Sequence, residues 1–498
     1  MGARLSEPQR EGPAAGARRI TRRNSRYLQD AVARDLIPSG ARCTPPGDIE
    51  MSAVSHGLFW MGVSNAVGVW LALLLLVPGL NAWAGEWTYG RWMPVHLNLH
   101  LYGWTSLPLL AWLFRLYRLD ATRAGRHARG TVWVWSLALA VGAVSWLGGT
   151  SSGKVFLDWS GFSRVLLTVA MLVLWGVLAW GWIGGMSRLR GKVDRACIRS
   201  CVMFMVRTLG LLILLTVPFV WYWAAGPEVY PVVNPESGGP TGVSLLGSTL
   251  VVLLCLMLVP ATLGQRRADR GPLMVWVGWC YVVFEIALYA VLDHAHASHR
   301  NLDQILGLGS LVPALVVMPL YYRCFHWPAG SRRWCGAGLF WIGLLALTGW
   351  LSFLPGVLDR LKFTNGLVAH SHLAMAGFIT SFNALVACLA LRGTRFESVL
   401  GSRWAFWCWQ AATMVYLLSM WVSGWLESEQ VAFTLVPNTG RTLIYGLRLA
   451  CGLVMLSASV AWWVRGWRLQ TAALKVRLQA QGVPARKPAT SEDEEVAA

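Results

Sequence analysis

Twelve apolar segments, each long enough to cross a lipid bilayer, recur along this chain of 498 residues. A membrane-spanning α-helix needs about 20 mostly apolar residues, and few soluble proteins repeat such runs from end to end. The chain is 55% hydrophobic and only 13% charged, which excludes an ordinary soluble domain. We therefore predict an all-α, polytopic membrane protein with twelve helices. The segments lie near residues 54–83, 92–117, 130–149, 160–184, 201–225, 241–264, 273–293, 303–322, 335–354, 365–391, 404–426 and 442–466.

The cationic residues are distributed unevenly between the loops. The loops that follow even-numbered segments contain 19 Arg and Lys residues, whereas the opposite loops contain 6. Short cytoplasmic loops are enriched in Arg and Lys, so this bias predicts twelve spans with both termini in the cytoplasm. The expected location is a bacterial inner membrane. The bias also accounts for the net charge of +19 without nucleic acid as a partner.

The two ends of the chain differ in composition from the apolar region. Residues 1–52 are polar, rich in Arg and without the apolar core of a signal peptide, and we expect a disordered basic cytoplasmic tail. Met51 is an alternative initiator, in which case most of this tail would not be translated. Residues 53–467 form the predicted membrane domain, and residues 468–498 a cytoplasmic C-terminal tail.

Two histidines lie inside the tenth apolar segment, in the run Thr364–Phe382 (TNGLVAHSHLAMAGFITSF). Positions two residues apart on an α-helix are rotated by about 200°, so His370 and His372 leave opposite sides. One helix could therefore ligate two metal centres, because imidazole is a common ligand of iron and copper. Ionisable groups within a membrane span are usually functional. The alternative is two polar side chains packed against a neighbouring helix.

Further histidines lie at a similar depth in two other segments. His96 and His100 are four residues apart near the start of the second segment, which places both on one helix face. His96 and His370 lie about 6–8 Å inside their helices, at 1.5 Å per residue. The seventh segment ends at LDHAHASH, which brings His294 to the same side of the membrane under the predicted topology. The sequence thus predicts one histidine-rich layer near the outer surface.

These features together resemble subunit I of the haem-copper oxidases. The shared features are twelve helices, an early His in the second, a His pair ending the seventh and His-x-His in the tenth. The runs TNGLVAHSHLAMAGF and LDHAHASHRNLDQILGLGSLV are most similar to the cbb-type cytochrome c oxidases and the related nitric oxide reductases. The resemblance covers roughly residues 54–466 and implies a twelve-helix bundle of the cytochrome c oxidase subunit I type.

The resemblance implies a role for each histidine. His96 and His372 would be the two axial ligands of a low-spin b-type haem. His370 would be the single axial ligand of a high-spin b-type haem. His294 and His296 would stand where that family holds copper beside the second haem. A solvated surface cluster is the alternative for this last pair, because it lies at a helix end.

The chain also departs from the pattern of that family. One Ala separates His294 from His296, whereas the family has adjacent histidines, and the sixth segment contains no His at all. The copper site is therefore incomplete, and the haem ligands are better retained than the copper ligands. Tyr289 matches the cross-linked active-site tyrosine of the family only loosely. His100 is an alternative to His96, since both share a face.

Charged residues in the spans could serve the haems. Arg448 and Arg441 in the twelfth segment and Arg164 in the fourth lie toward the outer surface, where Arg can pair with haem propionates. The alternative is that their side chains extend to the interface. Glu285 lies within the seventh segment, about 13 Å along the helix from His294. It would relay protons to the reaction centre, or pair with Arg207.

Three functions remain open from the sequence. The first is the catalytic subunit of a respiratory oxidase or nitric oxide reductase, which passes electrons from a low-spin to a high-spin haem. Because this chain has no CxxCH motif, a c-type cytochrome would be a separate donor, alongside other oxidase subunits. The second is a relative without copper that transfers electrons or senses a gas. The third is a transporter, although no inverted repeat is present.

Overall fold

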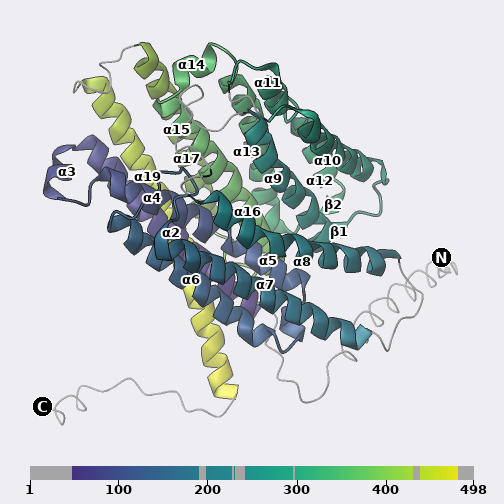
Figure 1. Cartoon of the computed structure of the whole chain (residues 1–498). Coiled ribbons are helices and arrows are strands. Elements are labelled where there is room, and N and C mark those ends of the chain that lie inside the picture. Colours follow the sequence, from purple (N-terminus) through teal and green to yellow (C-terminus); the bar gives the residue numbers. More distant parts are fainter. Residues whose placement is uncertain are drawn as a thin grey trace, which may run out of the picture. The chain divides into compact units, whose positions relative to one another are not determined.

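Helices form almost all the regular structure in the computed structural model, which describes residues 47–189, 198–226, 229, 242–294, 298–429 and 438–480. Within these residues, ten helical stretches are long and apolar enough to cross a membrane. This confirms an all-α polytopic membrane protein (Figure 1). The ten stretches are α2 (Asp48–Leu76), α6 (Gly125–Leu147), α7 (Gly161–Leu189), α8 (Ile198–Ala224), α9 (Gly242–Leu263), α10 (Leu273–Val291), α11 with α12 (Leu302–Gly309, Ala314–Tyr322), α13 (Ala329–Ser352), α15 to α16 (Asn365–Ala390) and α19 (Thr439–Ala480).

The other two predicted segments are helical as well. The second consists of α4 (Tyr89–Asn98), the π-helix η1 (Leu99–Thr105) and α5 (Leu107–Leu116), and the eleventh is α17 (Arg403–Glu429). The connections contain short elements. These are α3 (Gly79–Trp83), η2 (Leu119–Ala121), α14 (Val357–Leu361) and the antiparallel pair β1 (Gln265–Arg266) and β2 (Phe325–His326), in which Gln265 faces His326.

Two helices extend beyond the predicted domain boundaries. α2 begins at Asp48, so the last residues of the predicted N-terminal tail are helical. Asp48 forms ion pairs with Arg129 and Arg395, and an acidic residue also favours the first turn of a helix. α19 continues to Ala480 rather than ending near residue 467, because Gln470 accepts a hydrogen bond from Ser55 of α2. The rest of both predicted tails lies outside the described residues.

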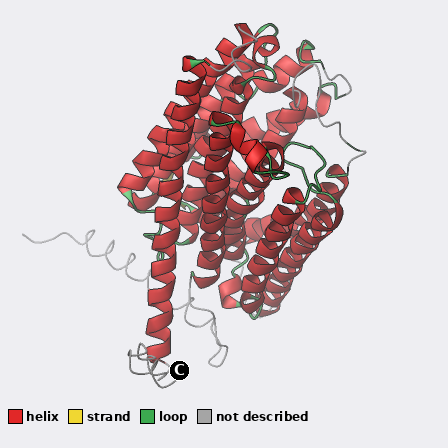
Figure 2. Cartoon of the chain, turned by 90° about the vertical axis from the view of Figure 1, so that its left-hand side faces the viewer, coloured by secondary structure: helices red, strands yellow, loops and turns green. Residues whose placement is uncertain are grey.

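The described chain is a bundle of helices (Figure 2), and the helix that contains His370 and His372 packs against several of them. It runs as α15 (Asn365–His372), the π-helix η3 (Leu373–Ile379) and α16 (Thr380–Ala390). In its most apolar stretch 83% of the residues are buried, against at most 44% in the other nine candidate spans of the described chain. α15 packs against α17, and α16 packs against α13 and α5. That most apolar stretch follows the histidines, and His370 and His372 themselves are half-buried where α15 meets its neighbours.

A glycine allows α15 and α17 to approach closely. A Cβ added to Gly424 of α17 would lie 2.6 Å from the Cα of Gly366 and closer still to its backbone nitrogen. Real Cβ atoms do not make such contacts with backbone, so the two helices could not keep this separation. Small residues at such crossings are typical of membrane helix packing.

We expect Gly424→Ala to push α15 away from α17 and to lower the unfolding free energy by about 1–3 kcal/mol or more, as in overpacked cores. Thermal unfolding of the purified protein in detergent measures the effect. Gly446→Ala in α19 is the control, because nothing lies within 4 Å of the Cβ it would add. Equal stability of the two variants would contradict this account of the packing.

Candidate functional site

His96 and His372 face each other across the boundary between α4 and α15. Their ring centroids are 6.2 Å apart and the ring planes differ by only 25°. The two residues are far apart in sequence, and each enters from a different predicted span. The structure therefore brings together the two imidazoles to which the resemblance assigns one haem, at a distance that leaves room for an atom between the rings.

Backbone carbonyls hold both imidazoles in the same orientation. His96 Nδ1 donates to the carbonyl of Ser64 at 2.8 Å, and His372 Nδ1 donates to the carbonyl of Val368 at 2.9 Å. A neutral imidazole that donates from Nδ1 has its lone pair on Nε2. Such a hydrogen bond to a carbonyl is the usual second contact of a metal-ligating histidine. Both rings thus have Nε2 available as a ligand.

α2 shapes the environment of His96. The Ser64 hydroxyl also donates to the His96 carbonyl at 2.8 Å, which joins α2 to α4 at this point. One turn further along α2, a Cβ on Gly68 would lie 2.7 Å from Cε1 of the imidazole. Glycine at this position therefore allows the ring to lie directly against the α2 backbone.

His370 points to the other side of α15. Its Cε1 lies 3.2 Å from the position that a Cβ of Gly349 in α13 would occupy. Its Nδ1 is buried and has no hydrogen-bond partner among the described residues, and the same is true of the Trp350 indole nitrogen on α13. Buried polar atoms in native proteins nearly always have partners, so these two nitrogens fit a site completed by a bound group.

A π-helix follows the histidine on each of the two helices. η1 begins three residues after His96, and η3 begins directly after His372. Single turns of π-helix are frequent at functional sites, and they disturb the regular pairing of backbone groups. Backbone N–H and C=O groups that lose their regular helical partners at membrane depth must form hydrogen bonds with other groups of the protein.

Side chains from other helices bind the carbonyls of these π-helical turns. The Asn383 amide donates to the carbonyls of Trp104 at 2.9 Å and Thr105 at 3.1 Å. The Trp135 indole donates to Tyr102 in η1, and the Trp409 indole donates to Ala376 in η3. The irregular segments are therefore fixed to their neighbours.

A polar network holds the start of α15. The Asn365 backbone N–H donates to Glu427 Oε2 at 2.7 Å, and its side-chain amide donates to Glu427 Oε1. A carboxylate at this position is favoured by the helix dipole. Arg448 Nη1 donates to Asn365 Oδ1 at 3.3 Å. The network joins α15, α17 and α19 at the histidine-bearing end.

Among the three arginines predicted for propionates, Arg448 lies nearest the histidine pair. Its guanidinium lies 5.6 Å from the Tyr416 ring centre, and that ring packs against His372 at 4.6 Å. Arg164 lies 3.8 Å over the Tyr222 ring, and Arg441 lies 5.4 Å over Tyr445. Arg164 and Arg441 are therefore held by aromatic rings of α8 and α19.

The remaining predicted ligands are not gathered around His370. His100 is buried in η1, and its Nδ1 has no partner in the part of the chain that the structure describes. His294 is exposed and donates to the Tyr289 carbonyl at 2.8 Å. His296 lies outside the described residues. Within the described residues, no group of three His, Cys, Asp or Glu side chains is arranged to hold a metal ion.

Asp359 of α14 fixes the loop after α10. Lys362 and Arg300 both donate to its carboxylate, and these bonds hold the pKa of Asp359 well below its usual range. His299 Nε2 also lies 3.3 Å from this carboxylate. Because α14 directly precedes α15, the loop following His294 is tied to the same end of the bundle as the histidine-bearing helix.

Glu285 is fully buried in α10. Its Oε2 accepts a hydrogen bond from Ser310 at 2.9 Å, while Oε1 has no partner among the described residues. Tyr281 donates to the Ser310 carbonyl at 3.1 Å. The Arg207 guanidinium instead lies 5.6 Å from the Trp182 ring centre, so the structure shows Glu285 with Ser310 rather than with Arg207.

Sequence reasoning missed several residues that build this site. Ser64 and Gly68 are four apart on α2, and a small pair in an apolar helix is a recognisable indication of close contact. Glu427 is an acidic residue near the end of an apolar segment, which is unusual enough to mark a partner. Nothing local in the sequence identifies Asn383 as the donor to η1.

Comparison with known proteins gives one partial similarity. No protein-family model matches the chain. Over 136 residues the chain is 29% identical to cytochrome c oxidase subunit 1 of Rhodobacter capsulatus, covering 25% of this chain and 24% of that protein. The match thus spans about a quarter of the relative. It supports similarity to an oxidase subunit of the haem-copper type, and the cbb-like branch stays a prediction.

We expect Asn383→Leu to lower the unfolding free energy by about 2–4 kcal/mol, because two buried carbonyls lose their donor. Denaturant unfolding in detergent, followed by helical circular dichroism, measures this loss. Thr216→Val is the matched control, since the Thr216 hydroxyl is exposed and bonds only within its own helix. A loss no larger than that of the control would show that these two bonds do not stabilise the π-helical turn.

Proposed function

We propose that this chain is the haem-binding subunit of an oxidase-like electron-transfer complex in a membrane. His96 and His372 would ligate one b-type haem from its two sides, and His370 would ligate a second b-type haem from one side. The single observation that carries the proposal is the His96–His372 pair, with its 6.2 Å separation. The partial similarity to cytochrome c oxidase subunit 1 supports the same function.

The geometry of the pair fits iron between two imidazoles. A metal–nitrogen bond of about 2 Å, with about 1.2 Å more from nitrogen to ring centre, sets each centroid about 3.2 Å from the metal. Two such ligands on opposite sides have centroids about 6.4 Å apart, close to the observed 6.2 Å. The carbonyl bonds at both Nδ1 atoms keep Nε2 unprotonated, as this ligation needs.

The residues around the pair have separate tasks in the proposed site. Haem supplies one-electron redox chemistry and, where one axial position is open, a place for a diatomic gas. Ser64 and Val368 orient the ligands, and Gly68 makes room for one ring. Arg448 would neutralise a propionate, because a guanidinium has five N–H donors and only part of them is used by Asn365. Glu285 and Ser310 would hold a proton within α10 and α11.

We propose reduction of oxygen or nitric oxide as the activity, with a c-type cytochrome as donor. A second candidate is electron transfer or gas binding without copper. It is favoured by the absence of His from the sequence of α9, where the family supplies a copper ligand. Copper analysis of the purified protein separates the two candidates: about one copper per two haems supports an oxidase.

A reduced-minus-oxidised spectrum of the purified protein tests the haem proposal directly. We expect b-type bands in the unmodified protein, and loss of the low-spin bands in His372→Leu and in His96→Leu. His100→Gln is the comparison, because His100 shares a face with His96 but does not pair with His372. A colourless protein would overturn the proposal, and loss of the low-spin bands in His100→Gln alone would transfer the ligand role to His100.

His370→Leu should abolish carbon monoxide binding to the reduced protein and leave the low-spin bands of the His96–His372 pair in place. The reason is that His370 points away from that pair, toward α13. Flash photolysis or a carbon monoxide difference spectrum measures this. Full carbon monoxide binding in the variant would refute the assignment of His370.

We expect Glu285→Gln to slow gas consumption about tenfold or more while the haem spectra stay unchanged, because an amide cannot release a proton. Oxygen or nitric oxide uptake with a reduced c-type cytochrome measures turnover. Glu86→Gln is the control, since Glu86 is exposed and pairs with Arg91. Undiminished turnover in Glu285→Gln with intact spectra would exclude the relay.

A further inference from the structure

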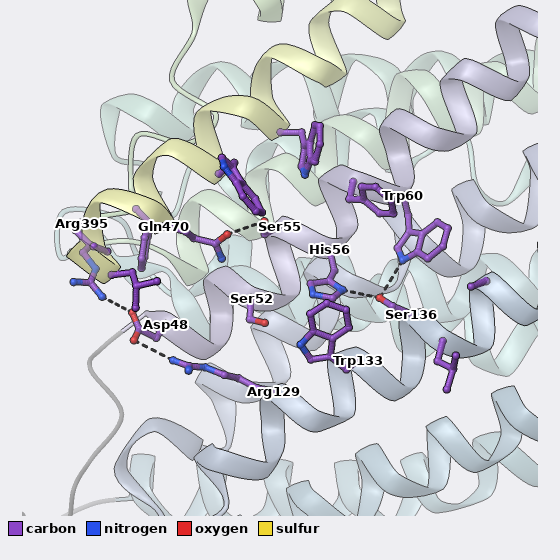
Figure 3. Close-up of a pocket in the computed structure, with 18 residues that line it drawn as sticks. Asp48, Ser52, Ser55, His56, Trp60, Arg129, Trp133, Ser136, Arg395 and Gln470 are labelled. Atoms are coloured by element: carbon purple, nitrogen blue, oxygen red, sulfur yellow. Dashed lines mark hydrogen bonds and ion pairs between the residues drawn. The ribbon is translucent and has the colours of Figure 1, made fainter. Parts of the chain in front are cut away.

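A groove opens between α2, α6 and α19 at the end of the bundle where α2 begins (Figure 3). Its volume is about 690 Å³, within the usual range for ligand sites. His56 in this groove precedes Ser64, the residue that holds His96, by eight positions. That spacing corresponds to about 12 Å along the helix. The groove is therefore separate from the proposed haem site.

One end of the groove is cationic. Asp48 Oδ1 pairs with Arg395 at 2.6 Å, and Asp48 Oδ2 pairs with Arg129 at 3.2 Å. The Asp48 side chain is only 5% exposed, whereas the Arg129 and Arg395 side chains are 46% and 37% exposed. Two guanidinium groups share one carboxylate, which leaves an excess of one positive charge. Both guanidinium groups stay partly exposed at this end of the groove.

The wall of the groove is aromatic and apolar, and much of it is exposed. Trp133 is 66% exposed and Trp467 is 59% exposed, and Phe59 packs against Trp463 at 5.8 Å. Leu137 continues the wall on α6. Tryptophan is enriched where a membrane protein meets lipid headgroups. Such a surface is suited to a molecule with acyl chains.

Uncharged polar groups lie beyond the cations, beside the aromatic side chains, and the Trp133 ring packs against His56 at 4.6 Å. His56 Nδ1 lies 2.7 Å from the Ser136 hydroxyl, which also accepts from the Trp60 indole at 3.0 Å. Ser55 donates to Gln470 at 3.1 Å across the groove floor. The groove thus combines a cationic end with uncharged polar groups and an aromatic, apolar surface, which are the three kinds of group that a phospholipid contacts.

We propose that this groove binds an anionic phospholipid. Its phosphate would lie on Arg129 and Arg395, its ester region beside His56 and Gln470, and its chains along Trp133 and the neighbouring apolar wall. Arginine binds phosphate through two parallel N–H donors, and basic pockets between membrane helices are known to take anionic headgroups. A neutral lipid or a quinone would leave the excess guanidinium charge uncompensated.

Native mass spectrometry of the detergent-purified full chain, titrated with phosphatidylglycerol or phosphatidylcholine, tests the proposal. We expect phosphatidylglycerol to bind about tenfold or more tightly than phosphatidylcholine. The double variant Arg129→Gln with Arg395→Gln should lose this preference. Arg126→Gln, an exposed arginine on the same turn of α6 outside the groove, should retain it.

If the double variant folds poorly, Asp48→Asn provides a second test. It retains both arginines and removes the carboxylate that competes with a lipid phosphate for them. We expect Asp48→Asn to bind phosphatidylglycerol at least as tightly as the unmodified chain. Equal binding of the two lipids, an unchanged preference in the double variant, or weaker binding in Asp48→Asn would overturn the proposal. The proposal would also be overturned if a short-chain quinone displaced phosphatidylglycerol equally well from the unmodified chain and from the double variant.

Discussion

Two hydrogen bonds from imidazole to backbone carbonyl determine what this bundle can do. They run from His96 to Ser64 and from His372 to Val368, and they fix both ring orientation and tautomer. Removing an imidazole from water without a partner is costly, so these bonds make it possible to place two half-buried histidines side by side. The rest of the proposed site depends on them, because a ring that donates from Nδ1 has the Nε2 lone pair available for a metal.

The surrounding helices are arranged so that these bonds survive in lipid. Gly68 and Gly349 let the rings lie against α2 and α13, and Gly424 lets α17 meet the start of α15. Glu427 and Arg448 then hold that start through Asn365. Small residues and polar contacts replace the hydrophobic effect as the force between helices, since lipid chains are as apolar as the helices themselves.

Most of the fold could be predicted from the sequence because the bilayer demands long apolar helices. Each of the twelve predicted segments corresponds to helix in the structure, and apart from the extension of α19 to Ala480 most ends differ by a few residues. The start of α2 and the end of α19 were misjudged because their partners, Arg395 and Ser55, are distant in sequence. The membrane sidedness of the loops stays a prediction.

The candidate site was predictable in part. The spacing of His370 and His372 predicts opposite faces, and depth along the helix favours His96 as the partner of His372. The network at Asn365 could not be predicted, because Glu427 and Arg448 belong to other helices. The carbonyls of the π-helical turn η1 also depend on a distant residue, Asn383, for their hydrogen bonds.

Each of the two histidine-bearing spans contains one π-helical turn, which separates it into two halves. The rotation of one half about the helix axis can therefore differ from that of the other. Each such turn accommodates an extra residue relative to an α-helix, and one residue corresponds to about 100° of rotation. Deletion of a single residue from Leu373–Ile379 would let the span form an uninterrupted α-helix. Either Asn383 would then rotate away from Trp104, or His372 would rotate away from His96. The angular setting of the imidazoles and the packing of the distal half can therefore be adjusted separately.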